Sequence, residues 1–146
     1  MVVFIVLIFV IVPITNFLHE LGHILIAKFY SVKGTMIVIG SGRKLFHFTL
    51  FNTKVFIHAV YFIGALSTNE SQEKITNWQK GLISLGGPFL NIGIGTCIYF
   101  SGFYHNQFVL LFMLFNMWVG VLNVLPFKIS KRESDGYVFV KSLLGR

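Results

Sequence analysis

Three long apolar stretches constrain this chain more than any other feature of its sequence. They cover residues 2–27, 81–100 and 108–127, and the second and third contain no Asp, Glu, Lys or Arg. A helix needs ~20 apolar residues to cross the hydrocarbon core of a bilayer, and each stretch supplies them. Of the 146 residues, 55% are hydrophobic and only 12% are charged, about half the charged share of an average soluble protein. The sequence therefore predicts a single domain over residues 1–146, mainly α-helical, with three transmembrane helices.

The basic residues predict how these spans are oriented. Seven of the 12 Lys and Arg lie between Lys28 and Lys80 and five between Lys128 and Arg146, with none before the first span or in residues 101–107. Cytoplasmic loops collect Lys and Arg, so both basic regions are expected in the cytoplasm. The N-terminus is then outside and the C-terminus inside. We attribute the net charge of +7 to this topology and to anionic lipids, with no nucleic acid as a partner.

Between the first two spans the composition changes to that of β-strands. Residues 35–39, 44–51 and 54–62 are rich in Val, Ile, Phe, Thr and Tyr, and expected turns at Gly40-Ser41-Gly42 and Asn52-Thr53 separate them. Within this region, residues 55–66 are strongly apolar but too few to span the bilayer, so they are expected at or within the membrane surface. The sequence thus predicts a small membrane-associated β-sheet or hairpin over about residues 35–66, followed by a polar connector over residues 67–80.

The run His19-Glu20-Leu21-Gly22-His23 places titratable groups inside the first span. On a helix, positions i and i+4 project from one face, so the two imidazoles can bind one tetrahedral zinc ion. Glu20 then lies beside the metal and can take a proton from water, whose pKa bound zinc lowers to ~7. Each ionisable group in a span costs ~2.5–3.5 kcal/mol on insertion scales, so such groups are functional by default. The alternative is a set of polar contacts between helices near the cytoplasmic interface.

A catalytic zinc site has three protein ligands, and several residues are candidates for the third. Asp135 is the only aspartate in the chain and follows the third span. With three spans it lies on the same side of the membrane as the zinc helix, which makes it the strongest candidate. The alternative is that Ser134-Asp135-Gly136 forms an ordinary surface turn. His47 and His58, in the strand-like segment, remain competing ligands, whereas the topology places His105 outside.

Three motifs, in this order along the chain, resemble the site-2 protease family of intramembrane zinc metalloproteases, peptidase family M50. They are His19-Glu20-Leu21-Gly22-His23, Gly87-Pro88-Phe89-Leu90-Asn91, and Asn123-Val124-Leu125-Pro126 followed by Asp135-Gly136. The resemblance covers nearly the whole chain and implies that family's three-helix catalytic core. It implies zinc ligands at His19, His23 and Asp135, a catalytic acid/base at Glu20, and contacts of Asn91 and Asn123 with the substrate backbone or the developing oxyanion. Hydrogen bonds between helices remain the alternative for both asparagines.

Two features depart from that family's usual pattern. The basic residues 128–134 intervene between Pro126 and Asp135, where relatives usually keep the proline close to the Asp-Gly pair. We also expect a small three-span form without the PDZ or CBS domains that many relatives carry.

The expected activity is hydrolysis of peptide bonds in membrane-embedded or membrane-associated peptides. Its expected partners are the lipid bilayer and a membrane-spanning or membrane-bound peptide substrate. Because a helical substrate must unwind before its carbonyl groups are accessible, a strand edge within residues 35–62 is expected to pair with it. The alternatives are a non-catalytic membrane metal-binding or peptide-maturation subunit and, on weaker grounds, a transporter component.

Overall fold

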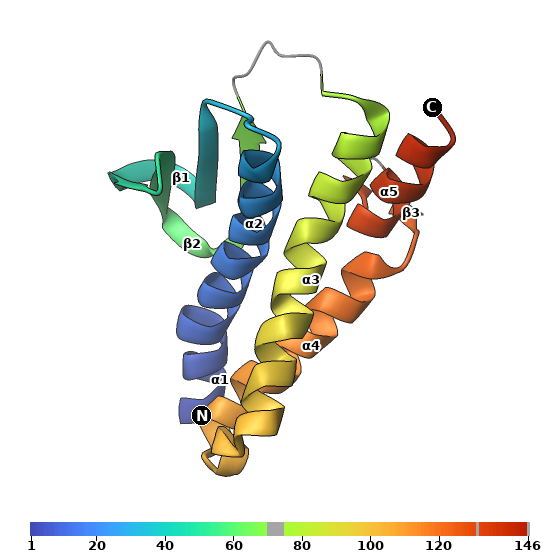
Figure 1. Cartoon of the computed structure of the whole chain (residues 1–146). Coiled ribbons are helices and arrows are strands. Elements are labelled where there is room, and N and C mark those ends of the chain that lie inside the picture. Colours follow the sequence, from blue (N-terminus) through green and yellow to red (C-terminus); the bar gives the residue numbers. More distant parts are fainter. Residues whose placement is uncertain (70–74, 131, 146) are drawn as a thin grey trace.

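The computed structural model describes residues 1–69, 75–130 and 132–145, and Figure 1 shows the whole chain. Its helices are α1 (Val2–Val6), η1 (Leu7–Ile11), α2 (Val12–Phe29), α3 (Asn77–Ser101), η2 (Phe103–His105), α4 (Gln107–Val124) and α5 (Asp135–Leu143). Its strands are β1 (Thr35–Leu50), β2 (Thr53–Asn69), β3 (Lys128–Ile129) and β4 (Arg132–Glu133). The predicted fold class is confirmed: the chain is mainly helical, with three helical segments long and apolar enough to cross a membrane and a β-hairpin between the first two. Part of the predicted polar connector, residues 70–74, lies outside the described residues.

The three spans differ from the predicted ranges at their ends and cover Val2–Phe29, Asn77–Ser101 and Gln107–Val124. The second begins earlier than predicted because Thr76 caps it. The Thr76 side chain accepts a hydrogen bond from the backbone of Gln79, and the Gln79 side chain accepts one from the backbone of Thr76. The third ends earlier because Pro126 disfavours the helical conformation in the residue before it, and Leu125 is extended.

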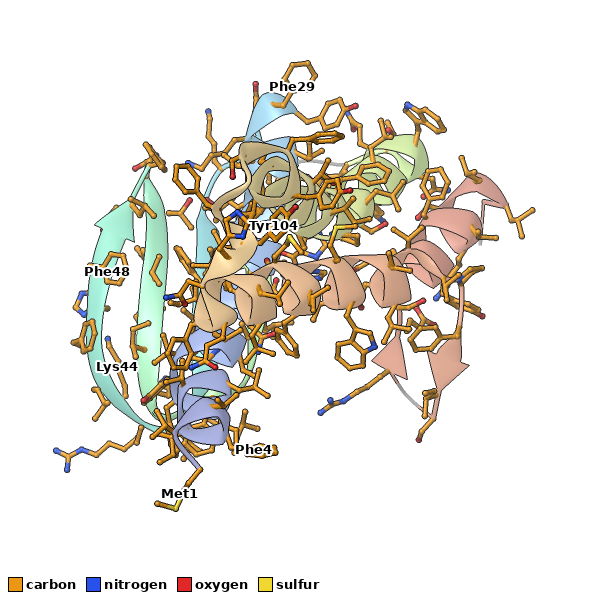
Figure 2. All side chains as sticks on the ribbon, turned by 90° about the horizontal axis from the view of Figure 1, so that it is seen from below. Met1, Phe4, Phe29, Lys44, Phe48 and Tyr104 are labelled. Carbon is orange, nitrogen blue, oxygen red and sulfur yellow. The ribbon has the colours of Figure 1, made fainter. Side chains whose placement is uncertain are left out.

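The first span is a continuous helical rod made of α1, η1 and α2 (Figure 1). The π-helical turn η1 ends two residues before Pro13, which has no backbone N–H, and a local change of helix type accommodates that missing donor. Phe4 and Phe29 project outward from opposite ends of the rod (Figure 2). An apolar outer surface of this kind suits a lipid environment.

The segment between the first two spans is one long antiparallel hairpin. Phe51 and Asn52 connect its strands, and both have positive φ, 47° and 58°, as a type I′ turn requires. The turn predicted at Gly40-Ser41-Gly42 does not reverse the chain. Gly40 and Gly42 have φ of +79° and +85° and bend β1 within a continuous strand. The β segment also runs to Asn69, slightly beyond its predicted end.

Both strands curl so strongly that the hairpin folds over itself. Ile37 has two pairing partners, Val55 and Ser67, and Val55 also pairs with Phe48. Residues 65–69 pair with the start of β1 and have no second strand partner among the described residues. They therefore form an open edge of the sheet.

The inner face of the sheet packs on α2. Ile24 of α2 forms a buried cluster with Ile37, Ile39 and Val55, which fixes the sheet beside the span that carries the His-Glu motif. The other face carries Lys44, whose Nζ lies 4.5 Å from the centroid of the Phe56 ring, whereas Phe48 faces Phe9 and Pro13 of the first span. Aromatic and basic side chains together suit the membrane surface, where the segment is predicted to lie.

Helix α3 is the central helix of the bundle and packs against α2, α4 and α5 (Figure 1). Its most apolar window is 44% buried, compared with 11% and 17% for the other spans. Helices α2 and α3 meet backbone to backbone at Gly22 and Gly86, where a Cβ on either glycine would overlap the carbonyl oxygen of the other. Small residues permit such close contact between membrane helices. This contact sets the rotation of α3 relative to the His-Glu motif.

Candidate metal centre

The structure brings His19, His23 and Asp135 together from α2 and α5. His19 Nε2 lies 3.0 Å from Asp135 Oδ2, and His23 Nε2 lies 3.5 Å from Asp135 Oδ1. One donor atom from each residue lies within 4.8 Å of the others. Within the described ranges, neither His47, His58 nor His105 joins this group.

The donor set and its spacing fit a zinc ion. With zinc–ligand distances of ~2.0–2.1 Å in a tetrahedral site, neighbouring donors lie about 3.3 Å apart. The separations of 3.0 and 3.5 Å lie on either side of that value. Two imidazole nitrogens and one carboxylate leave the fourth position open, as in catalytic zinc sites.

A backbone carbonyl determines which nitrogen of His23 faces the metal position. Nδ1 of His23 lies 2.8 Å from the carbonyl oxygen of Ile83 in α3. A carbonyl oxygen only accepts, so in the tautomer that satisfies this shorter contact, and not the 3.2 Å contact with the Gly87 N–H, Nδ1 carries the proton and donates. The Nε2 lone pair then faces Asp135. Metal-binding histidines are commonly oriented by such a partner. The ring reaches Ile83 because Gly87 has no side chain, since a Cβ there would lie 2.6 Å from His23 Nε2.

Asn91, also from α3, lies behind His19. It is fully buried, and its Nδ2 lies 3.3 Å from His19 Nδ1, while its Oδ1 has no hydrogen-bond partner in the described part of the chain. If His19 Nε2 is to bind a metal, Nδ1 carries the proton and needs an acceptor. Rotating the amide by 180° exchanges two atoms of similar size, places Oδ1 opposite Nδ1 and satisfies both groups. Asn91 therefore contacts a predicted ligand and does not line the cavity in front of the site.

Hydrogen bonds from two directions hold the start of α5, where Asp135 lies. Asp135 is the first residue of α5, and Ser134 caps that helix by accepting a hydrogen bond from the Tyr137 N–H at 3.2 Å. The Ser134 hydroxyl also donates to the Leu125 carbonyl at 2.7 Å. From the other side, the Ser84 hydroxyl of α3 donates to the Asp135 carbonyl at 3.1 Å. These contacts fix the start of α5, from which the carboxylate reaches α2.

The residues inserted before Asp135 do not displace it from the site. Most of them form the small β3–β4 hairpin, in which Lys128 pairs with Glu133 and Ile129 with Arg132. A hairpin returns the chain close to its starting point. The insertion therefore leaves α5 able to begin beside α3 and α4.

A cavity of about 570 Å³ opens in front of the three candidate ligands, and Glu20 lines it. Asn123 of α4 lines it too, with its Nδ2 donating to the Val119 carbonyl at 2.9 Å. Leu66 and Ser67, from the open edge of the sheet, form another part of the wall. The predicted acid/base residue, one predicted substrate contact and a strand edge thus share one cavity.

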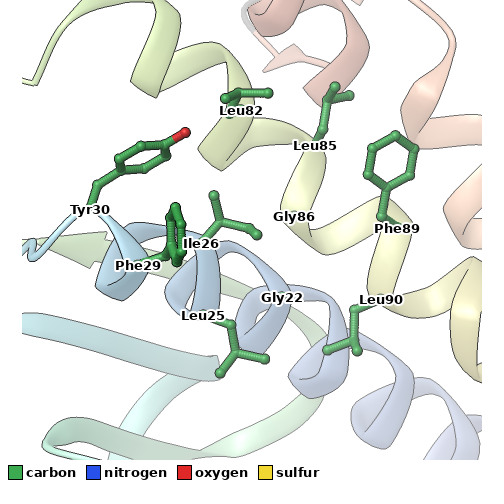
Figure 3. Close-up of a pocket in the computed structure, with 10 residues that line it drawn as sticks. All are labelled: Gly22, Leu25, Ile26, Phe29, Tyr30, Leu82, Leu85, Gly86, Phe89 and Leu90. Atoms are coloured by element: carbon green, nitrogen blue, oxygen red, sulfur yellow. The ribbon is translucent and has the colours of Figure 1, made fainter.

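Another cavity, of about 530 Å³, lies between α2 and α3 (Figure 3). Leu25, Ile26, Leu82 and Leu85 contribute to its apolar lining. Among the described residues that line it, Tyr30 has the only polar side-chain group, and none has a carboxylate, imidazole or amide. The titratable candidates of the site line the other cavity instead.

Four residues of the site were not predicted from the sequence: Ile83, Ser84, Gly87 and Ser134. Ser134, directly before an acidic first helical residue, has the composition of an N-cap, which is a usable signal. Gly87 is the first residue of the second motif, which marks the residue but not its contact with His23. Ile83 contributes a backbone carbonyl, which any residue has, so no sequence signal marks it.

The sequence profile of peptidase family M50 matches residues 3–107 of the chain. This chain belongs to peptidase family M50. With its three apolar helices, this M50 member is an integral membrane protein. The matched residues include the His-Glu motif and Asn91 but neither Asn123 nor Asp135, whose positions at the site come from the structure alone.

Two proteins from two strains of Helicobacter pylori, each named "Putative zinc metalloprotease", are similar to this M50 member. One is 31% identical over 100 residues, and the other is 32% identical over 98 residues. Each match covers 58% of this chain but only 29% and 28% of the two relatives. The match thus spans less than a third of the relatives' length.

Proposed function

We propose that this M50 member is an intramembrane zinc metalloprotease that hydrolyses peptide bonds of membrane-embedded or membrane-associated peptides. One observation carries the proposal. The Nε2 atoms of His19 and His23 converge on the carboxylate of Asp135, in a cavity that Glu20 also lines. The M50 membership and the names of the relatives support the same chemistry. Residues 1–146 then contain one intramembrane metalloprotease domain.

The chain's residues divide the work of hydrolysis. His19, His23 and Asp135 would hold zinc, which when bound polarises the scissile carbonyl and acidifies water. Glu20 takes a proton from the attacking water and delivers it to the leaving nitrogen. The water oxygen bonds to the carbonyl carbon, the carbon–nitrogen bond breaks, and the new amino terminus leaves with the transferred proton.

The two asparagines take different roles in this proposal. Asn123 faces the cavity, so it remains the residue that binds the substrate backbone. Asn91 takes the role of the interhelical hydrogen bond, since it is buried behind His19. It positions the imidazole by accepting from Nδ1, as partners of metal-binding histidines do.

The open edge at residues 65–69 is where the unwound substrate pairs. Leu66 and Ser67 of this edge line the metal cavity, whereas no residue of the range 35–62 does. The edge lies beyond the predicted range because β2 continues past residue 62 and curls back onto β1. A peptide added to an open strand edge gains backbone hydrogen bonds, while alternate side chains reach pockets.

The metal centre faces the cytoplasmic side in this proposal. The C-terminal end of α2, the N-terminal end of α3 and helix α5 lie at the same end of the molecule, opposite the N-terminus (Figure 1). Lys28, Lys33 and Lys80 flank these helix ends, as the distribution of basic residues in membrane proteins requires for a cytoplasmic side.

The decisive experiment compares zinc binding and hydrolysis in Glu20→Gln and Asp135→Ala. Glu20→Gln should retain zinc, measured by mass spectrometry of the metal, and reduce hydrolysis of a membrane-tethered peptide by roughly 10²–10⁴-fold. Asp135→Ala should lose both. Substrates trapped on Glu20→Gln in native membranes would supply the peptide. Hydrolysis that persists in Glu20→Gln contradicts the mechanism, and zinc binding without hydrolysis by the wild type favours a non-catalytic metal-binding or peptide-maturation subunit.

A further inference from the structure

A third cavity, of about 560 Å³, continues the metal cavity toward the β3–β4 hairpin. Arg132 and Glu133 of β4 line one side, and residues 63–66 of β2 line the other. Leu66 lines both this cavity and the metal cavity, so the two form one groove along the open edge of the sheet. We call the cavity lined by Arg132 and Glu133 the vestibule.

The vestibule has space for a side chain beside an uncovered strand. Gly40 and Gly64 line it with backbone alone and Ser41 adds only a small side chain, and a Cβ built on Gly64 would meet no atom within 4 Å. Ile63 and Leu66 are 66% and 60% exposed, although both are large and apolar. An extended peptide paired with this edge would cover them.

The charges around the vestibule favour a negatively charged ligand. The Glu133 carboxylate receives hydrogen bonds from Lys128 Nζ at 2.8 Å and Lys141 Nζ at 3.2 Å. The Lys128 hydrogen bond, followed by that of Lys141, lowers the pKa of Glu133, so this carboxylate is ionised and already paired. Arg132 adds a further positive charge at the cavity wall. Of the two carboxylates in the described residues of this hairpin and α5, Asp135 faces the two histidines and Glu133 is already paired with two lysines, so Arg132 is the charge on the vestibule wall that remains for a ligand.

We propose that the vestibule is a specificity subsite that binds an Asp or Glu side chain of an extended peptide substrate. Arg132 pairs with the substrate carboxylate, while the peptide backbone pairs with the β2 edge. The identity of the ligand as a substrate rests on the proposed proteolytic function. Arg132 and the rest of the hairpin lie outside the region that matches the M50 profile, so this subsite belongs to this chain's own insertion.

The structure also gives the distance between the subsite and the cleaved bond. Ser67 lines the metal cavity, and Ile63 lies beside the vestibule. A strand rises ~3.3 Å per residue, so these two positions are at most about 13 Å apart along β2, and Leu66 lies at both cavities. A paired substrate therefore places its acidic residue no more than about four residues from the bond that is hydrolysed.

Binding of two matched probes tests the subsite without requiring hydrolysis. Each probe is a fluorescein-labelled peptide with one apolar span and an extended juxtamembrane segment, carrying either a single Glu or a single Lys at the same position. Fluorescence anisotropy measures their Kd for the Glu20→Gln variant in phosphatidylcholine nanodiscs. The Glu probe should bind about fivefold more tightly than the Lys probe, in line with a partly exposed ion pair.

Substitutions of Arg132 should change this preference in a graded way. Arg132→Glu, made in the Glu20→Gln background, should reverse it, and Arg132→Gln should abolish it. Arg43→Glu is the matched control, because Arg43 is an exposed arginine of β1 that does not line the groove. The control should keep the fivefold preference for the Glu probe.

Four results would overturn the subsite. The first is a preference for the Glu probe that survives Arg132→Glu, and the second is an equal loss of that preference in Arg43→Glu. The third is that neither probe binds. The fourth is loss of the preference when phosphatidylglycerol is added, which would assign the vestibule to lipid headgroups. The proposed function fails separately. If Arg132→Glu reverses the preference but the wild type hydrolyses neither probe, the subsite is kept and the proteolytic function is rejected. If the wild type hydrolyses the probes but Arg132→Glu leaves the preference unchanged, the proteolytic function is kept and the subsite is rejected.

Discussion

Replacing Gly87 with alanine should weaken zinc binding by displacing His23. The added Cβ would lie 2.6 Å from His23 Nε2 and 2.8 Å from both His23 Cε1 and the His19 carbonyl oxygen. Ordinary van der Waals contact begins at 3.4 Å, so the ring or the helix must move by about 0.8 Å. The first two atoms belong to a rigid ring and the third to helix backbone, so neither neighbour can yield by a simple rotation.

A shift of this size exceeds what the metal centre can absorb. Distances in zinc sites hold to within ~0.2 Å. His23 is also tied to Ile83 by the 2.8 Å hydrogen bond from Nδ1, which opposes the movement. Loss of a partner that orients a ligand costs roughly 10–100-fold in metal affinity, and here the ligand itself is displaced. We therefore expect the Kd for zinc to rise about 100-fold.

The assay is a zinc competition titration against a chromophoric chelator, with far-UV circular dichroism as the test of fold. Alanine favours a helix interior over glycine by ~1 kcal/mol, so α3 itself should remain helical. Gly93→Ala is the matched control in the same helix, because a Cβ there would meet no atom within 4 Å. A Gly87→Ala protein that is folded and binds zinc within threefold of the wild type would refute the packing argument.

Three further predictions follow from the contacts around the site. Asn91→Leu should raise the Kd for zinc roughly 10–100-fold, whereas Asn91→Asp should raise it less, because Asp retains an acceptor for His19. Asn116→Leu is the control: it removes a hydrogen bond to Thr15 and should leave the Kd for zinc unchanged. Ser134→Ala should lower the free energy of unfolding by about 1 kcal/mol in thermal or denaturant unfolding, because α5 loses its cap, and an unchanged stability would contradict that role. For Glu133, a folded-state pKa below the ordinary 4.5 means that its stabilising effect is complete above pH 4.5 and is lost as the pH falls through the lowered value. The difference in Tm between the wild type and Glu133→Gln should therefore stay constant from about pH 6 to about pH 8 and shrink below pH 4.5, and a constant difference at all pH values would contradict the ion pairs.

The spans and the hairpin were predictable because their signals are local. A helix in lipid needs an unbroken apolar run, and residues 81–100 and 108–127 show one without any tertiary information. The span ends were less predictable because they depend on individual contacts, such as the reciprocal hydrogen bonds of Thr76 and Gln79. The bend at Gly40 and Gly42 was mistaken for a turn because glycine with positive φ suits both.

Counting spans predicts that Asp135 lies on the same side of the membrane as the zinc helix, and the resemblance implied that it joins His19 and His23, but neither gives the contacts that position it. Those contacts come from Ser84 and Ser134, which hold the start of α5. The placement of Asn91 was equally hidden, because its motif does not reveal how α3 is rotated. The glycine contact between α2 and α3 sets that rotation, and it exists only in the folded bundle.

The separation of His19 and Asp135 by 116 residues has a consequence for biosynthesis. At translation rates of ~5–20 residues per second, roughly 6–23 s pass between synthesis of the two histidines and synthesis of the carboxylate that joins them. During that time the nascent protein holds only part of its ligand set. Under the proposed function, a growing chain at the translocon therefore lacks the complete zinc site, which forms only once α5 has docked.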